Sequence, residues 1–457
     1  MKKRSGFYPR VRVRGGGAGA VSQAGGVLLV ETVRRIGLDT ALSTALEPWR
    51  RPRAVHDPGK VLLDLALAVA LGGDCLSDVA MLRAEPDLFG LVASDPTVSR
   101  LVDTLAAAGP RALAAVRQAR AEVRERVWSL AGDAAPNAAD EVVVDIDGVL
   151  VQAHSEKQDA AATWKKTFGH HPLFAFVDHG PGGSEPVAGL LRPGNAGSNT
   201  ASDHIAVAQQ ALAQLPKKYR RGRQTLIRTD SAGGTHDFLN WLTQRGRRLS
   251  YSVGMVITDA IHQAVLLVPA SAWTPATEPD GNTRDGAWVA ELAGDVLKGW
   301  PKGMRLIVRK ERPHPGAQLR ITDADGMRIT CFATNATGAP IAALELRHRQ
   351  RARAEDRIRA ARYTGLRNLP LHDASQNRVW LEIVQLALNL LAWMPMLALT
   401  GEARRWEPKR LRLRLFSTAA QLVTTGRRLW LRLARHWPWT QVITTAFERL
   451  QALPVPG

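Results

Sequence analysis

The chain has 457 residues, about three times a typical domain of roughly 150, so we expect two or three structural units. Its 61 lysines and arginines against 42 aspartates and glutamates give a net charge of +19, which favours a polyanionic partner, usually nucleic acid. Hydrophobic residues at 45% and charged residues at 23% exclude wholesale disorder. The two cysteines, Cys75 and Cys331, are too far apart to look like a ligand pair, which excludes a zinc-finger array and a disulfide scaffold.

The first 20 residues form a basic, glycine-rich segment that we predict to be a flexible arm able to lie along phosphates. No apolar core follows its basic start, so we do not expect a secretory signal. The most apolar stretch, 381–400, has membrane-spanning length but carries Glu382, Gln385 and Asn389, which favours a buried helix. We expect a cytoplasmic protein without a membrane partner, associated with the nucleoid when bound.

Residues 21–133 show helical periodicity and predict an all-α domain that binds DNA. Within it, two short helices at 77–84 and 96–107 are separated by a proline-containing break. They resemble a helix-turn-helix with Arg100 exposed near the start of its second helix. A plain helical bundle is the alternative, and the sequence leaves both open.

Residues 140–248 follow a linker and predict an α/β core, because short apolar strands come first and amphipathic helices follow. The expected strands are 141–148, 173–178, 187–192 and 224–230, and the expected helices are 203–215 and 235–245.

Residues 249–335 predict an antiparallel β-rich insertion, with a hairpin turn at Asp325-Gly326. Helical periodicity then returns in 336–400, and the basic segment 401–457 is predicted to be helical. The expected strands of the insertion are 251–257, 264–268, 288–292, 305–309, 320–322 and 328–333.

Three aspartates stand at the ends of predicted strands. Asp145 and Asp147 close the strand 141–148, and period-two alternation places both on the face opposite its apolar residues. Asp230 ends the strand 224–230, just before a glycine-containing turn and a helix. The carboxyl edge of a sheet is where α/β proteins place their sites. Aspartate also ends strands and caps helices routinely, so each residue alone allows both interpretations.

One predicted helix carries a carboxylate flanked by cations. At 100° per residue, His348, Arg351, Glu355 and Arg362 fall within a stripe roughly 60° wide. That pattern suits a metal ligand beside groups that hold phosphates. The alternative is a solvated ladder of ion pairs, for instance Glu355 with Arg359.

Basic clusters elsewhere are further candidates for DNA contact. In the C-terminal segment arginines interleave with tryptophans, which permits phosphate contact together with base stacking. The alternative is an amphipathic helix whose tryptophans are core residues and whose cationic face is solvated. The candidate DNA-binding residues are Arg100, Lys217, Lys218, Arg220, Arg221, Arg427 and Arg428.

Five short stretches occur in one order along the chain. They are Asp145-Ile-Asp-Gly-Val-Leu-Val, Ala153-His-Ser-Glu-Lys, Phe168-Gly-His-His-Pro-Leu, Leu191-Arg-Pro-Gly-Asn-Ala-Gly-Ser-Asn-Thr and Arg228-Thr-Asp-Ser-Ala-Gly. Together they resemble bacterial DDE transposases, and more narrowly the insertion-sequence 1380 family, a relative of the insertion-sequence 4 group. That group carries Tyr-two-Arg-three-Glu-six-Lys around its catalytic glutamate. This chain keeps the spacing and the central Arg351 and Glu355, but departs at His348 and Arg362.

The resemblance covers about 142–399 and implies a ribonuclease-H-like catalytic domain (140–248 and 336–400), interrupted by the β-rich insertion 249–335. It implies a catalytic triad that holds two Mg²⁺ ions, with Mn²⁺ able to substitute. The implied triad is Asp147, Asp230 and Glu355, with Asp145 as the alternative first residue. The implied phosphate-binding residues are Arg351, Arg362, His348 and Arg359. His170 and His171 could approach the metals or form a structural turn.

The implied activity is cleavage at transposon ends, followed by cut-and-paste transfer of the freed strand into target DNA. Double-stranded DNA is the expected partner, and synapsis of two ends implies a homodimer. Two other functions stay open: a transposase-derived DNA-binding protein with a dead site, and a nuclease of the same fold that does not transfer strands.

Overall fold

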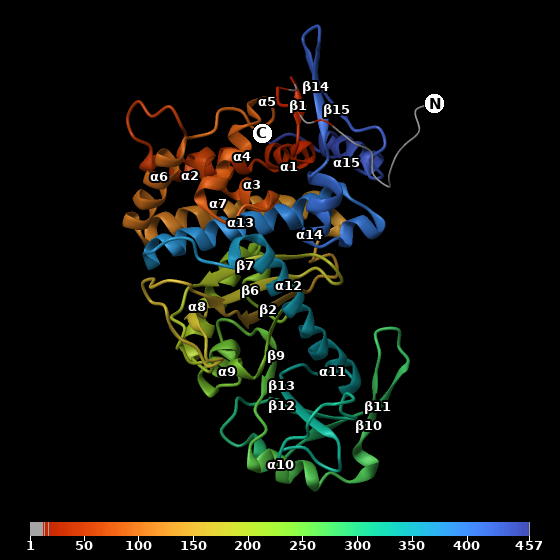
Figure 1. Ribbon diagram of the computed structural model, residues 1–457. Helices are drawn as coiled ribbons and strands as arrows, with labels where there is room; N and C mark the ends of the chain where they lie inside the picture. Colours follow the sequence, from red (N-terminus) through yellow and green to blue (C-terminus); the bar gives the residue numbers. More distant parts are fainter. Residues whose placement is uncertain (1–11, 13, 17, 457) are drawn as a thin grey trace.

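The computed structural model describes residues 12, 14–16 and 18–456 (Figure 1). The predicted flexible arm lies for the most part outside these residues. The described chain has a helical layer at one end, a central sheet, and further strands at the opposite end (Figure 1). The core runs from the helices into the sheet as one continuous cluster of buried side chains.

In the described part of the chain, seven α-helices precede the central sheet. Helix α3 is the most buried of them, because its sequence is apolar on every side. Asp57 caps its start by accepting a hydrogen bond from the backbone N–H of Lys60 at 3.0 Å, and Gly72 ends it. The helices are α1 (Val27–Ile36), α2 (Leu38–Leu46), α3 (Pro58–Leu71), α4 (Ala80–Arg83), α5 (Pro86–Phe89), α6 (Asp95–Ala108) and α7 (Pro110–Ala131).

The predicted helix 77–84 is broken into short turns. A 3₁₀ turn at Leu76–Val79 leads into the single turn of α4, and Pro86 begins the equally short α5. Helix α6 begins at Asp95, one residue before the predicted start, and packs along α13 and α7. The segment before α6 therefore consists of short turns, and the helix-turn-helix stays a prediction.

The central sheet has nine strands in the order β10-β11-β12-β13-β9-β8-β2-β6-β7. Strands β2, β8 and β9 run parallel, and every other neighbouring pair is antiparallel. The mixed α/β class therefore agrees with the prediction. The strands are β2 (Val142–Gly148), β6 (Leu173–Asp178), β7 (Ser184–Leu190), β8 (Thr225–Thr229), β9 (Ser250–Met255), β10 (Thr274–Thr277), β11 (Thr283–Leu292), β12 (Arg305–Glu311) and β13 (Arg328–Thr334). A small separate sheet contains β3 (Val151–Gln152), β5 (Phe168–His170) and β4 (Ala161–Ala162).

The insertion is antiparallel and continues the central sheet, because β13 pairs with β9. Two strands predicted there are wrong. Residues 264–268 fall largely in helix α10 (Asp259–Leu266), where Thr258 accepts a hydrogen bond from the N–H of Ile261 and so starts a helix. A short apolar run is compatible with a strand or with a helix, and the N-cap hydrogen bond favours the helix here. Residues 320–322 form no strand, although the turn at Asp325-Gly326 is closed by a bridge between its neighbours.

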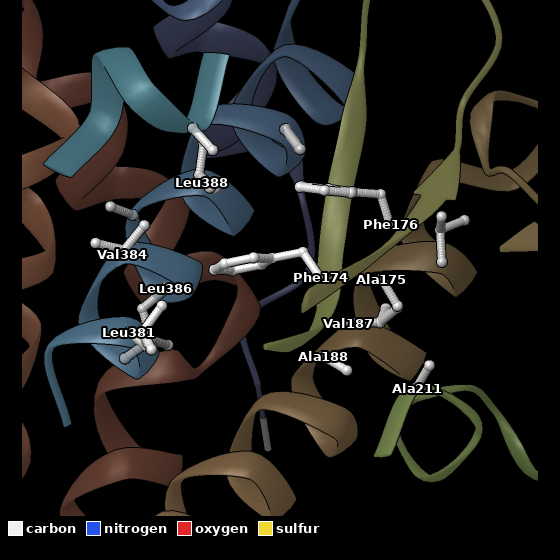
Figure 2. Close-up of a cluster of buried hydrophobic side chains, with 14 of the residues drawn as sticks. Phe174, Ala175, Phe176, Val187, Ala188, Ala211, Leu381, Val384, Leu386 and Leu388 are labelled. Carbon is white, nitrogen blue, oxygen red and sulfur yellow. The ribbon is translucent and has the colours of Figure 1, made fainter. Parts of the chain in front are cut away.

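Helices cover both faces of the sheet. Helix α13 (Ala374–Ala398) is long and apolar enough to span a membrane, but its most apolar window is 94% buried inside the protein. It packs on α3, α6, α7 and β7. Figure 2 shows Phe174 and Phe176 of β6 pointing toward it, with Ala211 of α8 (Ala201–Gln214) beyond the sheet. The other helices of this part are α9 (His236–Thr243), α11 (Ile341–Arg349) and α12 (Arg353–Ala361).

The C-terminal segment is only partly helical, which corrects the prediction of a wholly helical region. Between α14 (Pro408–Leu411) and α15 (Thr440–Ala452), the chain forms a hairpin of β14 (Ala420–Thr425) and β15 (Arg428–Leu433). Its turn places Gly426 at φ 62°, as a two-residue hairpin turn requires. The short strand β1 (Ala20–Val21) pairs with β14.

Candidate active site

Asp147 and Asp230 leave the sheet at the same level. Strand β2 pairs in parallel with β8, and the last paired residues are Ile146 and Thr229. Each aspartate follows its member of that pair by one residue, at the carboxyl end of its strand. The Asp230 side chain also accepts a hydrogen bond from the N–H of Ala232 at 3.0 Å, which starts the following turn. Register alone therefore brings the two carboxylates together.

Asp145 does not belong to this carboxylate pair, because arginines bind its side chain. Its side chain is fully buried, and both of its oxygens accept hydrogen bonds from Arg228 of β8, at 2.6 and 2.8 Å. Arg357 of α12 also pairs with it. The same two arginines bind Asp178, whose pKa burial would raise but which Arg357 and Arg228 lower. These four residues form a buried ion cluster that holds α12 against the sheet, so neither oxygen of Asp145 is without a partner.

The carboxylate pair is short of positive charge. Burial raises the pKa of Asp147 to about 6, and the charge of Asp230 adds to this shift. Arg351 opposes it, with its Nη1 at 3.2 Å from Asp147 Oδ2. Two neighbouring carboxylates, of which only Asp147 is paired with a guanidinium, form a site that a divalent cation would stabilise.

Two imidazoles border this edge. His171 lies against Gly148, where a Cβ atom would come within 2.7 Å of the ring Nε2. Glycine is therefore required for the ring to lie so near the end of β2. Burial, followed by the charge of Arg192, lowers the pKa of His171, and burial also lowers that of His204, while Asp230 opposes both shifts. Both rings are neutral near pH 7 and can donate one hydrogen bond and accept one.

Sequence reasoning singled out His171 but left its role open, and it did not consider His204. The only available signal for His171 was its place in the stretch that begins at Phe168. His204 looks like an ordinary position of an amphipathic helix, and it becomes noticeable only where α8 meets the site. Both histidines join the candidate site through tertiary contacts.

Glu355 lies on the predicted stripe between two arginines that both reach the end of β2. Arg351 pairs with Asp147, and Arg362 donates a hydrogen bond from Nη2 to the carbonyl of Leu150 at 2.8 Å. The Glu355 side chain is exposed, and within the described residues it makes no hydrogen bond or ion pair. Its carboxylate is therefore available beside the aspartate edge.

The three carboxylates do not meet at one point. Among the described residues, only Asp74, Cys75 and Asp78 place three potential ligand atoms within 4.8 Å of one another. That group is a turn cap, because Asp78 Oδ2 accepts hydrogen bonds from the backbone N–H groups of Asp74 and Cys75. At least one pair among the carboxylates of Asp147, Asp230 and Glu355 is therefore farther apart than 4.8 Å.

Two residues of the predicted phosphate-binding set have other partners. His348 stacks on Phe332 of β13, with ring centroids 4.3 Å apart, and burial lowers the pKa of His348 to about 3. It is thus a neutral ring turned toward the sheet. A 3₁₀ turn separates α11 from α12, and His348 Nδ1 is also hydrogen-bonded to Ser252 Oγ at 2.9 Å. Arg359 pairs with Asp356 at 2.6 Å, so the alternative ladder with Glu355 does not form.

The basic cluster before β8 lies at the other edge of the sheet. Residues 217–221 precede the amino end of β8, whereas Asp230 follows its carboxyl end. Five residues of strand separate the two by roughly 16 Å. Within the cluster, Lys218 pairs with Asp140 at 2.5 Å and Arg220 donates to a backbone carbonyl. Any DNA contact of these residues is therefore remote from the aspartates.

The remaining basic candidates lie in the helical layer and the hairpin. Arg100 is exposed on α6 and donates a hydrogen bond to Thr97 Oγ1 at 3.2 Å. Arg427 and Arg428 are exposed at the turn of the β14–β15 hairpin. Figure 1 shows this hairpin projecting from the end of the molecule opposite the β-rich insertion.

A sheet edge with paired aspartates, faced by a helix with an exposed glutamate, is typical of enzymes that act on phosphodiesters with the help of metal ions. The family model described as transposase DDE domain group 1 matches residues 3–455. The chain therefore belongs to that family of DDE transposases, which are generally polynucleotidyl transferases and use divalent metals.

No curated protein matches the chain. Among solved structures, it is similar to a piggyBac transposase synaptic complex with hairpin DNA, determined by cryo-electron microscopy. The TM-score is 0.44 and the sequence identity is 10%, over 85% of this chain and 80% of the other.

Proposed function

We propose that this protein is a transposase of the insertion-sequence 1380 type, which cleaves DNA at transposon ends and transfers the freed 3′ ends into target DNA by a cut-and-paste route. The observation that carries the proposal is the placement of Asp147 and Asp230 at one level of two parallel strands, beside the exposed Glu355. Family membership supports the reaction class, and the resemblance of the motifs supports the cut-and-paste route.

We further propose a ribonuclease-H-like catalytic core. The support is the arrangement of the five strands β2, β6, β7, β8 and β9. They lie in the order third-second-first-fourth-fifth along the sheet, with the first three antiparallel and the last two parallel to the first. Strands β10–β13 come between the second aspartate and the glutamate in sequence, where the motif resemblance leads us to expect an insertion.

Asp147, Asp230 and Glu355 are the proposed ligands of two Mg²⁺ ions, which Mn²⁺ can replace. Oxygen donors suit these ions, and the raised pKa of Asp147 reflects a carboxylate pair in need of positive charge. When bound, such ions activate the attacking oxygen and stabilise the leaving oxygen of a phosphodiester. Glu355 is the third proposed ligand, because its side chain is exposed and has no partner among the described residues.

The other residues of this edge have separate roles in the proposal. Arg351 neutralises Asp147 in the free protein and turns to the scissile phosphate when ions bind. Arg362, exposed at the end of α12, holds a flanking phosphate. The neutral His171 offers a hydrogen bond to a DNA oxygen beside Asp230.

His348 is not among the phosphate contacts, because its ring is stacked on Phe332. Arg359 is a peripheral contact that must first release Asp356.

The proposed partner is double-stranded DNA, consistent with the net charge of +19, and the proposed active state is a homodimer on two transposon ends in the cytoplasm.

In vitro cleavage tests the proposal. A duplex carrying the repeats that flank the gene is incubated with the full chain and Mg²⁺, and products are resolved at nucleotide level. Wild type should nick at the repeat boundary and join the freed end to a target plasmid. Asp230→Ala and Glu355→Ala should bind the duplex without cutting it.

The two other functions predict different results in the same assay. Cleavage without any joined product would identify a nuclease of the same fold. Binding without cleavage by the wild type, under Mg²⁺ and Mn²⁺, would identify a DNA-binding protein with an inactive site. Absence of both binding and cleavage would reject the proposed function altogether.

A further inference from the structure

The β14–β15 hairpin has one basic face and one apolar face. Directly paired residues of antiparallel strands share a face, and successive residues alternate between faces. The pairs of Arg428 with Thr425, Trp430 with Val423, and Arg432 with Gln421 therefore lie on one face. Arg428, Trp430 and Arg432 form a row along β15, and we call this row the arginine ribbon.

The charges of this ribbon are not neutralised by the protein. Within the described residues, Arg428 and Arg432 make no ion pair or side-chain hydrogen bond, and both are exposed. No aspartate or glutamate occurs between Glu407 and Glu448 in the sequence. Trp430 between the two arginines is 51% exposed, which is unusual for a large aromatic side chain. Uncompensated guanidiniums on both sides of an exposed indole indicate a surface made for a polyanion.

The shape of the hairpin narrows the choice of polyanion. Each strand has six residues, about 20 Å at the usual rise, and the hairpin projects clear of the helical layer (Figure 1). A two-stranded ribbon fits the major groove of B-DNA, which is about 12 Å wide. The base of the hairpin is held by β1, where Gly19 O accepts a hydrogen bond from the N–H of Leu422 at 2.7 Å. Because its base is held and its tip is free, the hairpin can enter a groove as a rigid unit.

We propose that the arginine ribbon enters the major groove and reads base pairs of the transposon end, away from the cleavage site. Arginine recognises guanine through a two-hydrogen-bond contact in that groove. Arg428 and Arg432 stand four residues apart on one strand, about 13 Å, which is the rise of about four base pairs. They therefore contact two base pairs separated by about that number, with Trp430 against a thymine methyl group between them. This inference rests on the proposed function for the identity of the DNA.

Binding-site selection with the full chain tests the proposal. A pool of duplexes with a randomised segment is enriched by the wild type in Ca²⁺, which does not support cleavage by carboxylate sites that require Mg²⁺. Arg428→Gln and Arg432→Gln are enriched separately from the same pool. The expected result is that each variant loses preference at one base-pair position, with the two positions about four apart. Affinity for the wild-type motif should fall roughly ten- to hundredfold per variant, with affinity for scrambled duplex nearly unchanged.

Two controls keep the result interpretable. Arg427→Gln changes a turn arginine off the ribbon, and it should weaken motif and scrambled duplex alike, with a shallower salt dependence. Leu429→Gln changes the apolar face of the same strand, and thermal unfolding checks that every variant is folded. Equal loss of specific and non-specific binding by Arg428→Gln and Arg432→Gln, or no loss, overturns base reading by the ribbon.

The remaining outcomes separate this inference from the proposed function. If the ribbon variants keep the wild-type motif while the wild type cuts DNA in Mg²⁺, the ribbon proposal fails and the transposase proposal stands. If the wild type enriches no motif and cuts nothing, both fail. If only Leu429→Gln has an effect, and that effect is a change of oligomeric state, the hairpin is an interface between copies of the chain and the ribbon proposal is rejected.

Discussion

Asp147 of β2 stands beside Asp230 of β8, each one residue past the last paired position of two parallel strands, whereas Asp145 lies two residues earlier within a buried arginine cluster. The two aspartates of one strand thus have opposite environments. One shares its surroundings with a second carboxylate, and the other is neutralised by Arg228 and Arg357. This contrast makes the two residues separable by stability measurements as well as by activity.

In the metal-free protein, we expect Asp147→Asn to be stabilising at high pH. The pKa of Asp147 rises from 3.8 to about 6 on folding, so the folded state binds this proton more tightly than the unfolded state. The associated stability is present below pH 3.8 and is lost as the pH rises through 6. The loss amounts to roughly 3 kcal/mol.

Urea unfolding at pH 5 and pH 8 in EDTA checks this prediction. Relative to wild type, the variant should gain free energy of unfolding between pH 5 and pH 8. Mg²⁺ should raise the unfolding temperature of the wild type at pH 8 but not that of Asp147→Asn. A variant that is less stable than wild type at pH 8 would contradict the account of the carboxylate pair.

Asp145→Asn should have the opposite effect. Removing this carboxylate leaves Arg228 and Arg357 buried with only Asp178 as a counter-charge, which costs about 3–5 kcal/mol at neutral pH. Chemical denaturation of the two asparagine variants in parallel measures the contrast. Similar stability of both would argue against the ion cluster as the anchor of α12.

Glu355→Gln should remove metal-dependent cleavage, by at least roughly a hundredfold, while stability changes by less than about 0.5 kcal/mol. The side chain is exposed and has no partner among the described residues, so folding loses nothing with its charge. Asp356→Asn is the matched control, because Asp356 is adjacent and exposed but pairs with Arg359. We expect it to cleave at close to the wild-type rate, and equal defects in both variants would reject the role of Glu355.

Arg124→Leu should unfold the interface between the helical layer and the sheet. Burial would raise the pKa of Glu185, but Arg124, at 2.9 Å, is the main cause that lowers it to about 2. Without this partner, Glu185 keeps only His179 and the indole N–H groups of Trp128 and Trp393, at a cost of about 3–5 kcal/mol. Arg111→Leu, an exposed arginine of the same helix, should change stability by less than about 0.5 kcal/mol. Differential scanning calorimetry of both variants measures this difference in stability.

The sequence by itself determined the local features of this protein. Alternation along residues 142–148 places Asp145 and Asp147 on one face, and helical spacing places Arg351, Glu355 and Arg362 on one stripe, because these periods belong to the backbone. The charge excess and the order of helices and strands are also properties of composition and pattern. The motif resemblance led to the DDE transposase family, which the family model confirms over residues 3–455.

Only the tertiary structure decided which of these residues work together. The strand register puts Asp147 beside Asp230. Arg228 and Arg357 lie 129 positions apart in the chain, and both pair with Asp145, so its carboxylate is not available to a metal ion. His348 stacks on Phe332 of β13, and no periodicity rule anticipates this contact. The pattern of the arginine–tryptophan segment predicts a helix, but the turn at Gly426 and the pairing with β1 belong to a β-hairpin. Local patterns fix which face a side chain occupies, but long-range pairing fixes its neighbours, and neighbours set charge, pKa and function.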